Sequence, residues 1–192
     1  MKPIGVVPFG DIPKIVLSAI VAHILGYLHI GADVVSPLKH PEYAYHKGRL
    51  QYDAGTILKA LESLPFHGYE KMIGVIDLDL FVPILSYVFG EARQGGGYAL
   101  VSLHRLKKNP DGSTATMPLL LERSGKVALH ELGHLFNLTH CEDEKCLMHF
   151  SGGIADLDRV TPEFCRYCTI YLRDALAPAN RKAPESINDS DF

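Results

Sequence analysis

Tryptophan is absent from this 192-residue sequence, and cysteine occurs only four times. No apolar run is long enough to cross a bilayer, since the most apolar segment, residues 15–28, is short and contains Ser18 and His23. The first residues are too few and too interrupted by proline and glycine to form a secretory signal peptide. These absences predict a cytoplasmic protein with no membrane partner.

Neither sign of charge dominates the sequence, which has a net charge of −3 and 21% charged residues. This balance gives no electrostatic case for binding nucleic acid or an anionic membrane. The hydrophobic content of 47% is typical of a globular protein. The length is enough for one domain, or one domain with a small subdomain, to bury a core without disulfides. We expect the chain to act as a monomer.

The four cysteines all lie in the last third of the chain, as the pairs Cys141/Cys146 and Cys165/Cys168. In a reducing compartment such pairs favour metal binding over disulfides. Four thiolates around a zinc ion leave no open position, so the predicted site is structural. It would tie the segment after His140 to the last helix. Two disulfides are the alternative, and they would require secretion.

What the sequence does contain is an H-E-x-x-H run at residues 130–134. Residues four apart share one face of a helix, so His130 and His134 can bind one metal ion. Glu131 projects beside that face, where it can reach a metal-bound water without binding the metal. Two imidazoles, one carboxylate base and an open position are the arrangement of zinc hydrolases.

His140 extends this motif, because it follows His134 by six residues. A continuing helix would carry His140 away from the metal, whereas a sharp turn after Phe136 would return it as a third ligand. Asn137 is suited to that turn, since helices often end on a left-handed Gly or Asn. Three neutral imidazoles leave zinc its full charge, which lowers the pKa of bound water from about 15.7 towards about 7. Glu131 would take the proton and pass it to the leaving amine.

The motif resembles that of the metzincin metalloproteases, H-E-x-x-H-x-x-G-x-x-H followed by a Met-turn, here Met148. With the cysteines it resembles more narrowly the archaemetzincin family, H-E-x-x-H-x-x-G-x-x-H-C-x4-C-x-M…C-x-x-C. Residues 87–92 (YVFGEA) and 101–106 (VSLHRL) are also similar to that family. Two positions depart from the patterns. Asn137 replaces the family's Gly, and Phe150 stands where some other metzincins place a Tyr that helps to bind the transition state.

The resemblance implies an α/β (α+β) fold with a twisted mixed sheet, a backing helix and an active-site helix. It also implies an antiparallel edge strand, at residues 87–93, that binds extended peptide by strand pairing. A small C-terminal helical subdomain would be held by the four-cysteine zinc site. The expected cofactors are two zinc ions, one catalytic and one structural. The family's Met-turn is a hydrophobic floor under the catalytic site and not a ligand.

Apart from the resemblance, segments with strand and helix periods alternate through residue 106 and predict a mainly parallel sheet covered by helices. A helix is predicted from Pro118 through the H-E-x-x-H run, then a loop at 151–160, and a last helix opened by Thr161-Pro162. Within this order we predict strands at 4–9, 30–38, 69–80 and 98–106, and helices at 15–28 and 53–64. We divide the chain into residues 1–137, 138–180 and a polar tail, 181–192.

The leading functional hypothesis is a zinc-dependent peptidase acting on peptides or proteins, and the alternative is a catalytically silent, zinc-stabilised module that binds them. Endopeptidase and aminopeptidase both remain open. An aminopeptidase needs an acidic anchor for the substrate amine, and the sequence cannot place Asp77, Asp79 or Glu91 beside the zinc. We predict a structural role for Asp77 and Asp79, as caps for backbone donors near a strand end. The glycines at residues 95–97 predict a tight turn.

Overall fold

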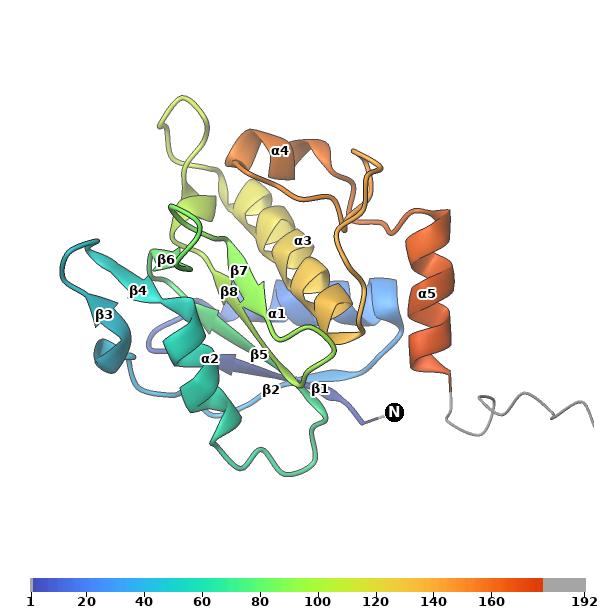
Figure 1. Ribbon diagram of the computed structural model, residues 1–192, viewed down its shortest axis with the longest axis horizontal. Helices are drawn as coiled ribbons and strands as arrows, with labels where there is room; N and C mark the ends of the chain where they lie inside the picture. The colour runs from blue at the N-terminus through green and yellow to red at the C-terminus, as the bar shows by residue number, and fades with distance from the viewer. Residues whose placement is uncertain (1, 178–192) are drawn as a thin grey trace, which may run out of the picture.

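The computed structural model describes residues 2–177, and a five-stranded sheet in the order β2-β1-β5-β8-β7 lies at its centre (Figure 1). Strands β2, β1, β5 and β8 run parallel, and β7 pairs antiparallel with β8, so the predicted mixed sheet is confirmed. The strands span Ala32–Val34 (β2), Ile4–Pro8 (β1), Lys71–Ile76 (β5), Tyr98–Ser102 (β8) and Gly90–Ala92 (β7). The edge strand therefore lies within the predicted segment 87–93.

Helices cover both faces of this sheet, which is why its central strands are almost continuously apolar (Figure 1). Alternate residues of each strand face opposite ways, as a period of two requires. Val6 packs in the core under α1 (Lys14–His23) and α3 (Met117–Leu135), whereas Val7 packs against α2 (Ala54–Glu62). Helix α3, which carries the H-E-x-x-H run, is thereby fixed across the face that adjoins the edge strand.

A close crossing anchors α3 to α1. A side chain at Gly125 would place its Cβ 2.5 Å from the ring of His23, so only glycine fits there. His23 is half-buried at this crossing and donates from Nδ1 to the Ala19 carbonyl at 2.8 Å. Helix α1 is shorter than predicted, because the segment Ile24–Leu28 continues as a π-helical turn that ends at the left-handed His29.

A small second sheet, in the order β3-β4-β6, flanks the central one. Its strands are Tyr45–His46 (β3), Gln51–Asp53 (β4) and Leu80–Phe81 (β6), and 3-10 turns occupy Glu42–Ala44 and Arg105–Lys107. Asp77 and Asp79 lie between β5 and β6, and the prediction that they cap backbone donors is wrong. Their partners are side chains and not backbone donors: Asp79 forms two bonds with Arg105, at 2.6 and 2.8 Å, and Asp77 pairs with Lys107.

The C-terminal region differs from its prediction in two elements. The predicted loop at 151–160 contains a short helix, α4 (Ile154–Arg159), which an ion pair between the buried Arg123 and the partly exposed Asp158 holds against α3. The last helix, α5 (Arg166–Leu176), begins after the predicted Thr161-Pro162 start. Thr161 instead bonds to the Lys145 carbonyl through its N–H, at 3.0 Å, and through its hydroxyl, at 2.9 Å.

The predicted division of the chain at residue 137 stays a prediction. Leu157 of α4 and Leu172 of α5 belong to the same apolar core as α1 and α3. The predicted polar tail, 181–192, lies outside the described residues. None of the helices within residues 2–177 has both the length and the apolar character needed to cross a membrane.

Candidate active site

Helix α3 brings His130 and His134 onto one face, with their ring centroids 4.8 Å apart. The Nδ1 of His130 lies 2.7 Å from the Leu147 carbonyl, and the Nδ1 of His134 lies 2.8 Å from the Leu138 carbonyl. A carbonyl can only accept, so each Nδ1 must carry the hydrogen and each Nε2 must hold a lone pair. The two Nε2 atoms are 3.1 Å apart. Two facing lone pairs repel each other and suit a shared cation.

The turn that returns His140 is the one predicted at Asn137. Helix α3 ends at Leu135, and Asn137 adopts the left-handed conformation, with φ of 69°. The Asn137 N–H donates to the His134 carbonyl and the Leu138 N–H donates to the Gly133 carbonyl, each at 2.9 Å. This pair of bonds is the Schellman motif, which ends many helices. Asn137 thus ends α3 as glycine would.

Beyond that turn, the ring of His140 lies 5.4 Å from that of His130 and 4.9 Å from that of His134, between centroids. One nitrogen from each of the three rings falls within 4.8 Å of the others. Burial lowers the pKa of all three imidazoles, and it lowers the pKa of His130 to about 3. The rings are therefore neutral near pH 7, as zinc ligands must be. The donor set fits a zinc ion with an open position.

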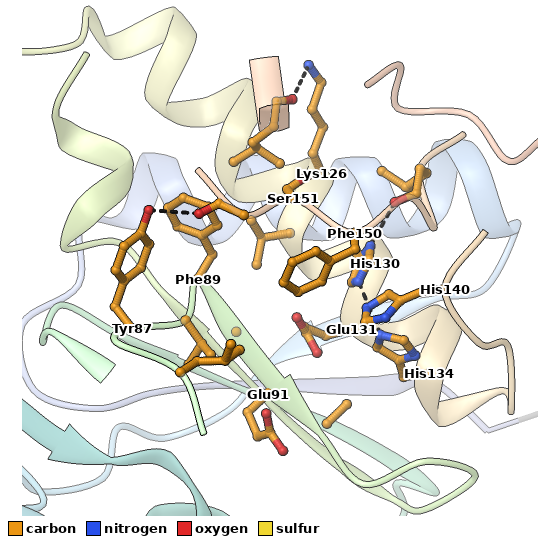
Figure 2. Close-up of a pocket in the computed structure, with 18 of the residues that line it drawn as sticks. Tyr87, Phe89, Glu91, Lys126, His130, Glu131, His134, His140, Phe150 and Ser151 are labelled. Atoms are coloured by element: carbon orange, nitrogen blue, oxygen red, sulfur yellow. Dashed lines mark hydrogen bonds between the residues drawn. The ribbon is translucent and has the colours of Figure 1, made fainter. Parts of the chain in front are cut away.

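Glu131 lies beside these imidazoles, on one wall of a cavity of about 390 Å³ (Figure 2). The facing wall is formed by β7 and the segment before it, including Tyr87 and Phe89. Glu131 is only 6% exposed, and burial raises the pKa of its carboxyl well above the usual value, with a smaller contribution from Glu91. A carboxyl group of raised pKa is suited to accept a proton and release it again.

Gly90 on β7 makes room for this carboxylate. A Cβ at Gly90 would lie 2.5 Å from Oε1 of Glu131 and 2.7 Å from the Leu100 carbonyl oxygen. The edge strand therefore passes directly against the carboxylate. The sequence contained this glycine in the YVFGEA segment, but no local pattern indicated that it lies opposite Glu131.

Of the three carboxylates considered as a substrate anchor, only Glu91 lines the cavity. It lies on β7, and burial raises the pKa of its carboxyl. Asp77 and Asp79 pair with Lys107 and Arg105 instead and do not line the cavity.

The mouth of the cavity carries Phe150, whose half-exposed ring lies edge-on to His140, with centroids 5.2 Å apart (Figure 2). Met148 lies beneath the site and is fully buried. A Cβ at Gly133 would meet its sulfur at 2.4 Å, so this helical glycine lets the methionine approach α3. Met148 is thus an apolar floor, as the resemblance implied.

The four cysteines form a second cluster, in which one sulfur from each lies within 4.8 Å of the others. All four are free thiols, and the sulfurs of Cys141 and Cys165 are 3.7 Å apart. Thiolates arranged tetrahedrally around zinc are separated by roughly 3.8 Å, whereas a disulfide requires about 2 Å. The Cys146 sulfur also accepts the N–H groups of Met148, at 3.4 Å, and Cys165, at 3.3 Å. The donor set and spacing fit a closed zinc site.

The sheet is mainly parallel, with an antiparallel edge strand, and it packs against a helix that carries two histidines and a glutamate close to a third histidine. This fold and this site define the class of zinc metallopeptidases with a metzincin-like fold. Residues 21–174 match the model of peptidase family M54, and the chain belongs to that family. Zinc is the metal that this membership supports.

Curated relatives and solved structures agree with this assignment. The chain is 39% identical over 178 residues to an archaemetzincin of Pyrococcus furiosus (89% of this chain, 92% of the relative) and 41% identical over 168 residues to one of Methanopyrus kandleri (85% and 91%). Its fold is similar to the crystal structure of the Methanopyrus kandleri archaemetzincin, with a TM-score of 0.80, 37% identity and coverage of 91% of this chain and 96% of that chain. The Archaeoglobus fulgidus archaemetzincin complexed with malonate is similar too, with a TM-score of 0.77, 30% identity and coverage of 88% and 99%.

Proposed function

We propose that the chain hydrolyses peptide bonds with a zinc ion held by His130, His134 and His140, and with Glu131 as general base. The observation that carries this proposal is the convergence of three neutral imidazoles on one point beside a buried carboxylate. The carbonyls that accept from Nδ1 of His130 and His134 support it further, because they fix both rings with Nε2 free to bind.

A zinc ion held by these nitrogens would supply Lewis-acid activation of a water molecule and of the peptide carbonyl. Glu131 accepts a proton from the attacking water at its carboxylate and delivers that proton to the amine nitrogen that leaves. The wall formed by β7 keeps bulk water away from one side of the carboxylate.

The substrate would bind along β7. This strand pairs with β8 on one side and, within residues 2–177, has no strand on its other side. An extended peptide can pair its backbone with such an edge. Since Gly90 brings the edge strand against Glu131, a peptide on the strand would lie with its backbone close to the proposed base.

A second zinc ion, held by Cys141, Cys146, Cys165 and Cys168, would have a structural role, because four sulfur ligands leave no position for substrate. We further propose a cytoplasmic location, which the four free thiols favour. The proposed acting form is a monomer without nucleic acid, for which a net charge of −3 gives no electrostatic case.

The test is hydrolysis of a peptide library by the zinc-loaded protein and by Glu131→Gln, followed by mass spectrometry. We expect the substitution to lower kcat by about 10²- to 10⁴-fold, because the carboxamide cannot take a proton, while peptide binding persists. Glu70→Gln is the matched control, since Glu70 is exposed and lies outside the cavity.

Equal cleavage by the wild type and Glu131→Gln would remove Glu131 from the mechanism. Tight peptide binding with no cleavage by either protein would favour the silent binding module.

A further inference from the structure

The side chain of Gln94 connects the edge strand to the end of the active-site helix. Gln94 follows β7 by two residues and lines the cavity. Its Nε2 donates to Oδ1 of Asn137 at 3.3 Å and to the Leu138 carbonyl at 3.1 Å. A carboxamide nitrogen has two hydrogens, so both bonds can form at once.

Both acceptors belong to the turn that ends α3. Asn137 is the left-handed residue of that turn. The Leu138 carbonyl also accepts the Nδ1 hydrogen of His134 at 2.8 Å. One carbonyl oxygen therefore binds both the proposed zinc ligand and Gln94, and its position determines the orientation of the imidazole.

The next residue, Gly95, also binds the end of α3. Gly95 donates its N–H to the His134 carbonyl at 2.9 Å and has a φ of +64°. A Cβ on Gly95 would come within 3.2 Å of Oδ1 of Asn137, so a larger residue would crowd the turn. The predicted tight turn at 95–97 thus packs against the end of α3 as well as reversing the chain.

Asn137 gives this turn an acceptor that glycine would lack. The archaemetzincin pattern has Gly at this position, and Gly also accepts a left-handed conformation. The acceptor of the Gln94 hydrogen, at 3.3 Å, is the side-chain Oδ1 of Asn137, an atom that glycine does not have. Asn137, which replaces the Gly of the pattern, is therefore bonded by Gln94 in this chain.

We propose that Gln94 is a positioning residue for the histidine site: it holds the Asn137 turn and the Leu138 carbonyl, and through them the imidazole of His134. The proposal rests on the proposed function only in taking His130, His134 and His140 as zinc ligands. Removal of a group that orients a zinc ligand typically weakens metal binding about 10- to 100-fold. Gln94 acts through a carbonyl and not on the ring itself, so we expect the low end of that range.

The experiment is Gln94→Met, which keeps the length of the side chain and removes both donors. Zinc affinity is measured by competition with a chromophoric chelator, and exchange of the Leu138 amide hydrogen is measured by NMR. We expect the histidine site to bind zinc about tenfold more weakly, the four-cysteine site to be unchanged, and the Leu138 amide to exchange faster. Arg93→Met is the matched control, because Arg93 is exposed, precedes Gln94 and pairs with Glu62 of α2.

A second variant tests whether Gln94 acts through the side chain of Asn137. Asn137→Gly keeps the left-handed turn but removes Oδ1, so Gln94→Met should cost less zinc affinity in that background than in the wild type. Unchanged zinc affinity and unchanged Leu138 exchange in Gln94→Met would overturn the proposal, and so would equal zinc loss from both sites, which indicates general unfolding. These measurements need no peptidase activity, so a protein that binds zinc normally but cleaves nothing would contradict the proposed function alone.

Discussion

At the scale of single residues, two glycines set how closely the active site is packed. Gly133 on α3 leaves space for the sulfur of Met148, and Gly90 on the edge strand leaves space for the carboxylate of Glu131. Glycine inside a helix costs about 1 kcal/mol relative to alanine, so Gly133 weakens α3 locally. The close approach of Met148 offsets that cost, since the methionine is fully buried against the helix.

Gly90→Ala tests the role of the edge strand in holding the proposed base. The added methyl would clash with Oε1 of Glu131 and with the Leu100 carbonyl, and must displace one of them. A displacement of about 1 Å at a catalytic group can cost roughly 100-fold in rate. We expect kcat to fall by about that factor while the histidine site still binds zinc, as measured by peptide hydrolysis and zinc titration.

The control is Gly26→Ala. A Cβ at Gly26 would meet no atom within 4 Å, and the residue is exposed. Its activity should equal that of the wild type. A Gly90→Ala protein with wild-type turnover would show that the carboxylate does not depend on this contact.

At the scale of elements, the local sequence pattern predicted the structure correctly wherever a single segment contained all the residues that determine it. The H-E-x-x-H spacing placed His130 and His134 on one helix face, and a left-handed asparagine placed the turn before His140. Apolar runs located β1, β5 and β8, because both faces of those strands are buried. These predictions needed no knowledge of contacts distant in the sequence.

The elements that were missed depend on distant contacts. Helix α4 has six residues and no side-chain cap, so its own sequence gives little helix signal. The start of α5 was misplaced because the Thr161 hydroxyl binds the Lys145 carbonyl and does not cap a helix. Gly90 and Gln94 were missed at the site for the same reason, since their partners lie on α3 and on the turn after it.

Asp158→Ala tests how α4 is held in place. The side chain of Arg123 is 1% exposed, and its guanidinium makes two bonds to Asp158, at 2.7 and 2.6 Å. It also donates to the carbonyls of Leu106 and Lys108, so it cannot turn to solvent without losing them. Loss of one partner of a buried ion pair costs about 3–5 kcal/mol. We expect a loss near 3 kcal/mol in the free energy of unfolding, measured in urea, because Asp158 is partly exposed.

Asp156→Ala on the same helix is the comparison. Its partner Arg159 is 75% exposed, and exposed ion pairs contribute about 0–1 kcal/mol. Equal losses in the two variants would mean that the pair between Arg123 and Asp158 does not anchor α4.

At the scale of the whole molecule, one short segment links the two proposed metal centres. Cys141 directly follows His140, and its N–H donates to the Met148 carbonyl at 2.9 Å. His149 bonds from Nδ1 to the Cys141 carbonyl at 3.0 Å. The third histidine, the apolar floor and two of the thiols thus form one unit, and α5 closes that unit through Cys165 and Cys168.

Cys168→Ser on α5 tests this coupling, because it changes the cysteine site without touching the segment that carries His140. Serine is a poor zinc ligand, so the four-cysteine site should lose its zinc and the midpoint of thermal unfolding should fall. His140 would then be held less firmly, and we expect the histidine site to bind zinc about tenfold more weakly. Zinc content after dialysis and chelator competition measure both effects. Tyr167→Ser, at a 73% exposed position of the same helix, should change neither. A histidine site that keeps wild-type affinity after the cysteine zinc has left would mean that the turn after α3 holds His140 by itself.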